Sequence, residues 1–341
     1  MAIYLHIAEP NKFTLPFCEY INYCLKRDNH IFLFTSDSFE QEKFTGKKVY
    51  CFLQRFRNHF LSNTILFYKL CKKADIIYMH GAQFTTLFIF FPLFIKKLAW
   101  VINGSDLYCM INKPRLKSLD PNRLVLKHAH TYVTHIKGDA DLANRVLNNN
   151  AKFHYATLYM SNTISTDNFS PKKIVNKARI LVGNSNSKNN NHLHIFEKLK
   201  AFENEIEYIL CPLSYGDDLE YKITVKETGS AMFGQKFRTL ETFLSPDQYN
   251  EVLSEIDIAV FNHWRQEALG ATLSLLSLGK IVYVNPKTTS YKSLTERGFQ
   301  IFDNNLLFSM GPIVNRDVNR NKELIEQYYS MKVMLETLEL L

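Results

Sequence analysis

The chain has 341 residues, a mass of 39.8 kDa, 46% hydrophobic residues and a formal net charge of +8. This length allows a substantial buried core and predicts two domains. The charge indicates an anionic partner, such as a nucleotide, an acidic membrane surface or nucleic acid, without choosing among them. The six cysteines show no CxxC pair and no metal-type spacing, which is typical of reduced core thiols.

The first part of the chain alternates predicted strands with predicted helices. Strands are expected at residues 2–7, 30–35, 49–53, 75–79, 99–102 and 131–134, and helices at 15–26, 62–73, 124–129 and 138–147. No basic segment precedes the first strand, so we expect no signal peptide. Short polar loops at the strand ends favour a parallel sheet that is covered by helices on both faces.

The most apolar segment is residues 84–95, FTTLFIFFPLFI, which is followed by Lys96 and Lys97. It is interrupted by Pro92 and is far shorter than the roughly 20 residues that span a bilayer. We therefore expect a buried or membrane-touching helix here.

Residues 161–178 are rich in Ser, Thr, Asn and Lys with little apolar pattern, which predicts a linker between domains. The alternation then restarts. Strands are expected at 180–182, 207–211, 240–243, 257–261 and 281–284, and helices at 192–200, about 219–225, 246–256 and 269–278. The predicted domains are thus 1–160 and 179–318, with a C-terminal helical region at 319–341. We expect two doubly wound, Rossmann-like α/β domains with a cleft between them.

In open α/β sheets, ligands bind outside the carboxyl ends of the strands. Gly183 follows the strand at 180–182, and the polar loop 184–191 leads into a helix, so backbone N–H groups and a positive dipole end would meet a phosphate. The loop at 213–216 and the segment 262–270 lie at further strand ends. Arg265 offers a fork of donors that suits a diphosphate, and Gly270 permits close approach of the backbone.

The strand ends of the first domain carry candidate general bases. His6, Glu9, His80 and Asp106 each have a side chain that can take a proton from a hydroxyl group. Asp106 and His80 stand out because each lies near a glycine at a strand end. Taken singly, each of these residues is more readily explained by a structural role than by catalysis. No Walker motif, HExxH or serine-centred elbow is present.

Four segments resemble motifs of one family, in the family's order. They are residues 80–84 (HGAQF, near HGQF), 100–108 (WVINGSDLY, near W-x-x-W-G-x-D-L-Y), 183–192 (near GNS…N-x-H) and 265–272 (near RQQ-x-G-x-T). The chain is therefore similar to the Fuc4NAc (4-acetamido-4,6-dideoxygalactose) transferases of enterobacterial common antigen synthesis, glycosyltransferase family 56. It departs from the pattern at Ala82, Asn103 and Glu267.

The resemblance implies an inverting, metal-independent GT-B hexosyltransferase. Such an enzyme uses a dTDP-sugar and extends an undecaprenyl-diphosphate-linked saccharide as a peripheral protein on the cytoplasmic face of the bacterial inner membrane. It implies Asp106 as the base, with His80 second. The expected donor-binding residues are Gly183, Asn184, Ser185, Asn190, His192, Tyr215, Arg265, Gln266, Gly270 and Thr272.

The basic residues support contact with anionic lipid. Those near the apolar segment or in nearby loops are Arg55, Arg57, Lys96, Lys97, Arg115 and Lys117, although a solvated face explains them equally well. They are dispersed rather than gathered with stacking aromatics, so we expect no nucleic-acid binding. The alternatives are an O-antigen or lipooligosaccharide transferase that uses another nucleotide-sugar, and a GT-B-fold sugar-nucleotide epimerase.

Overall fold

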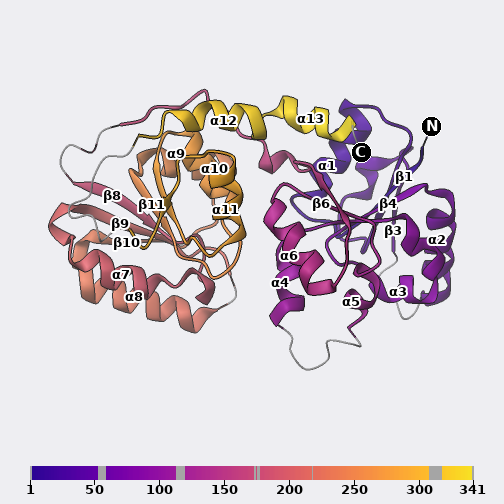
Figure 1. The fold of residues 1–341 in the computed structure, drawn as a ribbon, viewed down its shortest axis with the longest axis horizontal. Coiled ribbons are helices and arrows are strands. Elements are labelled where there is room, and N and C mark those ends of the chain that lie inside the picture. The colour runs from indigo at the N-terminus through magenta and orange to yellow at the C-terminus, as the bar shows by residue number, and fades with distance from the viewer. Residues whose placement is uncertain are drawn as a thin grey trace. The chain divides into compact units, whose positions relative to one another are not determined.

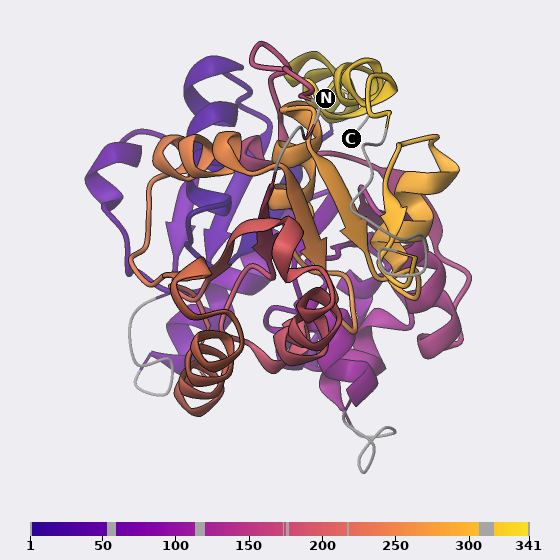
Figure 2. The ribbon, with the colours of Figure 1, turned by 90° about the vertical axis from the view of Figure 1, so that its left-hand side faces the viewer.

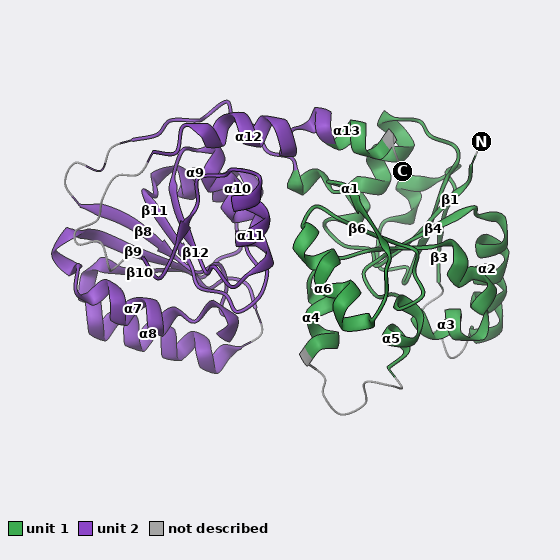
Figure 3. Cartoon of the chain, in the orientation of Figure 1, with its two compact units in different colours: residues 1–162, 334–341 green, residues 163–333 purple. Residues whose placement is uncertain are grey.

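The computed structural model describes residues 2–52, 59–112, 120–172, 174, 177–216, 218–306 and 317–339. It divides into two compact units, which Figure 3 colours separately. Unit 1 contains residues 1–162 and 334–341, and unit 2 contains residues 163–333. The C-terminal segment therefore returns to the unit that the N-terminus begins.

Unit 1 is built on a seven-stranded parallel sheet (Figure 1). Its strands are β1 (Tyr4–Ala8), β2 (His30–Phe34), β3 (Val49–Cys51), β4 (Ile76–His80), β5 (Leu98–Val101), β6 (Thr131–Thr134) and β7 (Lys152–Tyr155). They lie in the order β3-β2-β1-β4-β5-β6-β7. The six predicted strands are confirmed. The edge strand β7 was not predicted, because its sequence KFHY alternates polar and aromatic residues over only four positions.

The helices of unit 1 follow the predicted positions with two differences. They are α1 (Thr14–Glu19), continued by the π-helical turn η1 (Tyr20–Cys24), η2 (Gln41–Phe44), α2 (Phe60–Lys73), α3 (Thr85–Phe90), η3 (Pro92–Lys97), α4 (Ser105–Asn112), α5 (Pro121–Leu126), α6 (Lys137–Leu147) and η4 (Met160–Asn162). Pro92 divides the apolar segment into α3 and η3, since proline cannot continue a helix. Helix α4 was not predicted.

Side chains of alternate strand residues enter two separate cores. Leu5 and Ile7 of β1 pack into a cluster with residues of α2, α3 and α6. The neighbouring residue Ala8 faces the other side, where Phe17 of α1 and Met334 of α13 (Met331–Glu339) pack. Burial on both faces explains why β1 is apolar apart from His6.

Unit 2 repeats the arrangement with a six-stranded parallel sheet. Its strands are β8 (Ala178–Val182), β9 (Ile206–Pro212), β10 (Phe237–Leu240), β11 (Ile258–Phe261), β12 (Ile281–Val284) and β13 (Phe302–Asp303), in the order β10-β9-β8-β11-β12-β13. The strand predicted at 240–243 was wrong by three residues, because β10 pairs with β9 from Phe237 onward. The two-residue edge strand β13 was not predicted.

Helices cover both faces of this sheet. They are α7 (His192–Lys200), α8 (Leu219–Phe233), α9 (Pro246–Glu255), α10 (Leu269–Ser277), α11 (Thr289–Glu296) and α12 (Arg320–Tyr329), with short turns η5 (Lys188–Asn190), η6 (Glu203–Glu205) and η7 (Gly234–Lys236). Helices α7 and α8 lie on one side of the strands and α9 to α11 on the other (Figures 1 and 2). Helix α9 begins as predicted at Ser245, which forms a capping box with Gln248.

Both sheets reverse their strand order at one point. The reversal lies between β1 and β4 in unit 1, and between β8 and β11 in unit 2. Helices that follow such neighbouring strands leave on opposite faces, so a crevice opens at the carboxyl ends of the two strands. The predicted fold class, two doubly wound parallel-sheet units, is confirmed.

Candidate active site

Gly183 is the first residue beyond β8, at the strand-order reversal of unit 2. Its φ is +70°, and a Cβ atom at this position would lie 2.3 Å from Nε2 of His192 and 2.9 Å from Oδ1 of Asn190. No real Cβ tolerates such contacts, so only glycine permits both side chains to approach the strand end. Gly183 thus lets the side chains of His192 and Asn190 approach the strand end, and its contact with a phosphate stays a prediction.

Asn190 organises the loop that follows. Its Oδ1 accepts a hydrogen bond from the backbone N–H of Asn184 at 2.8 Å, and its Nδ2 donates to Ser185 Oγ at 2.8 Å and to Ser187 O at 3.0 Å. These partners fix which end of the Asn190 amide is oxygen. Three predicted site residues, Asn184, Ser185 and Asn190, thus form one buried network.

His263 joins this loop to the next strand of the sheet. It lies just beyond β11 and is buried, and its Nε2 is 2.9 Å from Oδ1 of both Asn184 and Asn190. Because Asn190 Oδ1 is an acceptor, His263 Nε2 carries the proton and donates. Burial, with a smaller effect from Arg265, lowers the pKa of His263 to about 3, so the ring is neutral.

The N-terminus of α7 faces this network. His192, the first residue of α7, is buried, and Tyr221 Oη accepts from its backbone N–H at 3.0 Å. Burial, with a smaller effect from His263, lowers the pKa of His192 to about 3. Its Nε2 has no hydrogen-bond partner in the described part of the chain. Among the described residues, the side chain of the N-cap residue Asn191 makes no capping hydrogen bond to α7. An anion is suited to such a helix end.

Helix α10 starts in the same way beside β11. Its N-cap residue is Ala268, in the left-handed region at φ 57°, and among the described residues its side chain supplies no cap. A Cβ added at Gly270, in the first turn, would meet no described atom within 4 Å. The two helices that follow the two strands at the order reversal therefore both begin without a side-chain cap from their N-cap residue among the described residues, and the space beside Gly270 is open.

Arg265 lies between β11 and α10 and is held by an acid of its own loop. Its Nε and Nη2 donate to Glu267 Oε1 at 3.0 and 2.6 Å. The other oxygen of Glu267 is buried, 4.0 Å from His263 Nε2, and has no hydrogen-bond partner among the described residues. Glu267 stands where the family motif has glutamine. Contact between Arg265 and a diphosphate stays a prediction, and it requires this ion pair to be shared or exchanged.

The remaining predicted donor residues are less closely joined. Tyr215 is exposed, and its backbone carbonyl accepts from the N–H of Asn186, which ties the 213–216 loop to the loop after β8. Thr272 is buried within α10, and Gln266 is partly exposed. Roles for all three stay predictions.

His263 and Glu267 were not predicted as site residues. His263 directly follows the strand-end residue Asn262, so the strand-end rule alone was sufficient to mark it. Asn285 and Asn304, beyond β12 and β13, hold this turn by donating to His263 O at 3.0 Å and to Asn262 Oδ1 at 2.9 Å. Their role depends on strand order, which the sequence does not state.

In unit 1, Asp106 lies in the first turn of α4 rather than in the predicted loop. Its Oδ2 accepts from Trp100 Nε1 at 2.9 Å, and its Oδ1 accepts from the N–H groups of Leu107 at 2.9 Å and Asn103 at 3.2 Å. Burial raises the pKa of Asp106 to about 6, against these hydrogen bonds, which lower it. A carboxylate with a pKa near neutrality is suited to general base catalysis.

His80, the last residue of β4, does not face the surface. Its Nε2 lies 3.0 Å from His6 Nδ1, and its Nδ1 lies 2.8 Å from Tyr159 Oη. Burial lowers the pKa of His80 to about 3. With both ring nitrogens engaged by protein groups, His80 is poorly placed to take a proton directly from a substrate. Asp106 is the stronger of the two candidates.

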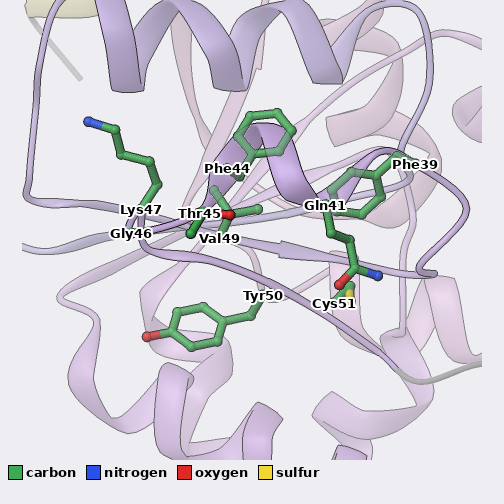
Figure 4. Close-up of a pocket in the computed structure, with 9 residues that line it drawn as sticks. All are labelled: Phe39, Gln41, Phe44, Thr45, Gly46, Lys47, Val49, Tyr50 and Cys51. Atoms are coloured by element: carbon green, nitrogen blue, oxygen red, sulfur yellow. The ribbon is translucent and has the colours of Figure 1, made fainter.

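A hollow elsewhere in unit 1 offers little chemistry. It has a volume of about 230 Å³ and is lined by nine residues between Phe39 and Cys51 (Figure 4). Of these nine, only Lys47 is charged. In the described ranges, no group of three or more His, Cys, Asp or Glu is arranged to hold a metal ion, and metal independence stays a prediction.

The fold is that of GT-B glycosyltransferases. The chain is similar to Anabaena Alr3699/HepE in complex with UDP (12% identity, 99% of each chain, TM-score 0.71). It is also similar to a glycosyltransferase from Rickettsia africae ESF-5 (13% identity, 99% of this chain and 97% of that one, TM-score 0.68). A third similar structure is the lipopolysaccharide outer core galactosyltransferase WaaB (11% identity, 98% of each chain, TM-score 0.68).

The family follows from the sequence match. The model of the 4-α-L-fucosyltransferases, glycosyl transferase group 56, matches residues 7–328. The chain belongs to this family and is a glycosyltransferase. The resemblance found in the four motifs is thereby confirmed.

Proposed function

We propose that the chain transfers a sugar from a nucleotide-sugar, held by unit 2, to a hydroxyl group of a lipid-linked saccharide. The main support for this proposal is the strand-order reversal of unit 2, where His263 links two loops that lead into helices whose N-cap residues provide no side-chain cap among the described residues. Backbone N–H groups and two dipole ends meet there, and a diphosphate is the ligand with matching charge. The complexes of HepE with UDP and with UDP-glucose support the same class of donor.

The reaction inverts the anomeric centre. The acceptor oxygen bonds to the anomeric carbon as the bond to the diphosphate oxygen breaks, and the hydroxyl proton passes to the carboxylate of Asp106. The helix N-termini and Arg265 stabilise the charge that grows on the leaving diphosphate without a metal ion. The donor is a dTDP-sugar of the Fuc4NAc type, as the motif resemblance implies, and the family description supports a 6-deoxyhexose.

Nucleotide affinity tests the donor site. His263→Ala removes the donor that joins Asn184 and Asn190, so we expect dTDP binding to weaken about tenfold or more by calorimetry, since breaking a buried hydrogen-bond network costs roughly 1–3 kcal/mol. The matched control is His194→Ala, an exposed histidine of α7, which should bind normally. UDP run in parallel identifies the base preference. Equal affinity of both variants and the wild type contradicts the donor site.

Turnover tests the base. Asp106→Asn keeps an oxygen for Trp100 but cannot accept a proton, so we expect the transfer rate to fall by about 10²–10⁴-fold with dTDP affinity within about twofold. The assay measures sugar transfer to a polyprenyl-diphosphate-linked saccharide. Near-normal turnover of this variant excludes Asp106 as the base.

The acceptor is expected at a membrane surface, and unit 1 has a suitable face. We define the α2–α3 surface as the exposed residues Phe60, Leu61, Ile65, Tyr68, Ile89, Phe90 and Leu93 of α2, α3 and η3. The elements pack together, with Tyr68 of α2 5.5 Å from the Phe91 ring between α3 and η3. Leu61 and Leu93 are 72% and 77% exposed. An apolar surface of this kind matches a lipid interface, such as the cytoplasmic face of the inner membrane.

Lysines accompany this surface, though not all that were predicted. Lys69, Lys72, Lys73 and Lys96 are exposed on α2 and η3. Lys97 instead turns back, and its Nζ donates to the carbonyl groups of Cys71 and Ala74 at the end of α2. Arg55, Arg57, Arg115 and Lys117 lie outside the described residues. Among the described residues, no helix is both long and apolar enough to span a bilayer.

A further inference from the structure

Three histidines and a tyrosine of unit 1 form a continuous hydrogen-bonded chain. His30 Nδ1 lies 2.9 Å from His6 Nε2, His6 Nδ1 lies 3.0 Å from His80 Nε2, and His80 Nδ1 lies 2.8 Å from Tyr159 Oη. The chain crosses the sheet from the start of β2, through the middle of β1, to the carboxyl end of β4. All three imidazoles are buried, whereas Tyr159 is partly exposed.

The three histidine rings of this hydrogen-bonded chain are neutral. Burial lowers the pKa of all three histidines, that of His30 to about 4 with a smaller effect from Arg27, and that of His80 to about 3. Each ring therefore carries one proton, and each of the three contacts must contain one. Only two arrangements satisfy this condition, one with every proton on Nδ1 and the other with every proton on Nε2.

The free end of the chain distinguishes the two arrangements. His30 Nε2 is buried and has no hydrogen-bond partner among the residues that the structure describes. If every ring carried its proton on Nε2, this atom would be an unsatisfied buried donor, which is rarer in proteins than an unused acceptor lone pair. The arrangement with every proton on Nδ1 is therefore favoured. His30 donates to His6, His6 to His80, and His80 to Tyr159, and each bond polarises the next.

The direction of the chain determines what Tyr159 can do. Because Tyr159 Oη accepts from His80, its own O–H must point to another group. Burial and, to a smaller extent, the negative charge of Asp106 raise the pKa of Tyr159. The two side chains are therefore within electrostatic range of each other. Asp106 Oδ2 would be 3.8 Å from a Cβ on Gly81, the residue after His80. The phenol and the carboxylate thus lie beside the same strand end.

We propose that Tyr159 donates a hydrogen bond to the acceptor hydroxyl oxygen and positions it for Asp106, and that His30, His6 and His80 form a one-directional hydrogen-bond chain that holds Tyr159 in this donor state. The proposal rests on the proposed transferase function. No proton crosses the chain, and the acceptor proton goes to Asp106. Tyr159 touches the substrate, while the three histidines are positioning residues that act through it.

The alternative is a buried polar network that serves folding alone. The proposal differs from this alternative first in that it requires a particular position for each imidazole proton, which ring spectroscopy measures. Nitrogen-15 spectra of histidine-labelled protein at pH 7 distinguish a protonated Nδ1 from a protonated Nε2. We expect Nδ1–H at His30, His6 and His80, in contrast to the Nε2–H form at His263. A protonated Nε2 at His80 overturns the proposal, because Tyr159 then donates inward. This measurement does not depend on enzymatic activity.

The proposal differs from the folding-only alternative also in that it requires the Tyr159 hydroxyl group for transfer to the acceptor, which kinetics measure. Tyr159→Phe removes one oxygen atom, and we expect kcat/KM for the lipid-linked acceptor to fall about tenfold or more, with dTDP affinity unchanged. The matched control is Tyr132→Phe in the same unit, which removes a buried hydroxyl that donates to Leu126 O at 3.2 Å. That variant should keep its acceptor kcat/KM within about twofold.

Rescue at His80 separates positioning from folding. His80→Asn retains a side-chain N–H near the position of Nδ1, so it should keep acceptor kcat/KM within about threefold of the wild type. His80→Leu should match Tyr159→Phe. Wild-type kinetics in Tyr159→Phe overturn the proposal while the transferase function stands. A wild-type protein that neither binds dTDP nor transfers sugar overturns the proposed function, and the role of Tyr159 with it.

Discussion

Gly183 illustrates how one residue governs the donor site. The buried side chains of His192 and Asn190 both occupy the space that a Cβ atom at this position would need. The backbone also turns through a positive φ, which costs an L-residue roughly 1–2 kcal/mol. Sterics and backbone conformation therefore require glycine for two independent reasons.

Gly183→Ala should lower the free energy of unfolding by about 2–4 kcal/mol, the sum of backbone strain and overpacking. Gly46→Ala is the control, because Gly46 has φ +77° and a Cβ there meets no described atom within 4 Å. It should cost only about 1 kcal/mol. Urea denaturation measures both values. Equal losses in the two variants would mean that His192 and Asn190 can move aside at little cost.

Several residues with a predicted role are already bonded to other protein groups. Arg265 is paired with Glu267, Lys97 caps the end of α2, and His80 is bonded to His6 and Tyr159. In each case the residue type suited the predicted chemistry. The partners of Lys97 and His80 belong to other elements, whose proximity follows from the fold, whereas Glu267 is only two residues from Arg265 in the same loop.

At the scale of secondary-structure elements, the α2–α3 surface is a group of exposed apolar side chains on unit 1. Phe67 and Leu70 lie on the buried face of α2, and the centroid of the Phe67 ring is 5.1 Å from that of Phe88 in α3. The other face exposes Leu61 and Ile65. Packing thus uses only part of the apolar residues of these elements.

Membrane binding tests this surface. The double variant Leu61→Ser and Leu93→Ser should bind anionic vesicles about tenfold or more weakly in flotation assays, because each leucine loses apolar burial in the lipid interface. The control is Leu219→Ser on α8 of unit 2, a leucine that is 67% exposed. Binding of the wild type should fall at high salt as the lysines are screened. Equal flotation of the variants would exclude the α2–α3 surface as the docking face.

At the scale of the whole molecule, five buried histidines make the fold sensitive to acid. Burial lowers the pKa of each of them below its ordinary value. They are His6, His30, His80, His192 and His263. Below an unfolded-state pKa of about 6.5, the unfolded chain binds protons that the folded chain excludes. Stability should therefore decline as the pH falls below about 6.5, towards the folded-state pKa values of about 4 for His30 and about 3 for His80, His192 and His263.

Asp106 acts in the opposite direction, because its folded-state pKa is raised to about 6. At pH values between the ordinary pKa of an aspartate and about 6, the folded state binds a proton that the unfolded state does not. This one group therefore stabilises the fold as the pH falls. Five histidines outweigh one carboxyl group. Each excluded proton contributes at most about 1.4 kcal/mol per pH unit.

Urea denaturation at pH 7 and pH 5 measures the net effect. We expect a lower free energy of unfolding at pH 5. His80→Asn should reduce the difference, since an amide does not titrate. Stability that is constant over this interval would mean that the buried histidines gain compensating partners when protonated.

Much of this architecture was predictable from local patterns. Strands buried on both faces are mostly apolar, as in β1, β4, β8 and β11, where the exceptions are His6, His80 and Arg179, and these strands were found. The edge strands β7 and β13 were missed, because an edge strand has less apolar surface to bury. Helix α4 was missed because its first turn, Ser105 and Asp106, resembles a polar loop.

The sequence by itself determined the α/β alternation, the family motifs and the strand ends at which polar residues gather, because these depend on neighbours within a few positions. Only the tertiary structure decided which of those residues meet. His6 and His80 are 74 positions apart, and Asn184 and His263 are 79 apart. Their contacts depend on strand order and register, which are set by packing of the whole sheet rather than by local propensity. The contacts that Tyr159 makes with His80, and His263 with Asn184 and Asn190, were not predictable from the sequence for this reason.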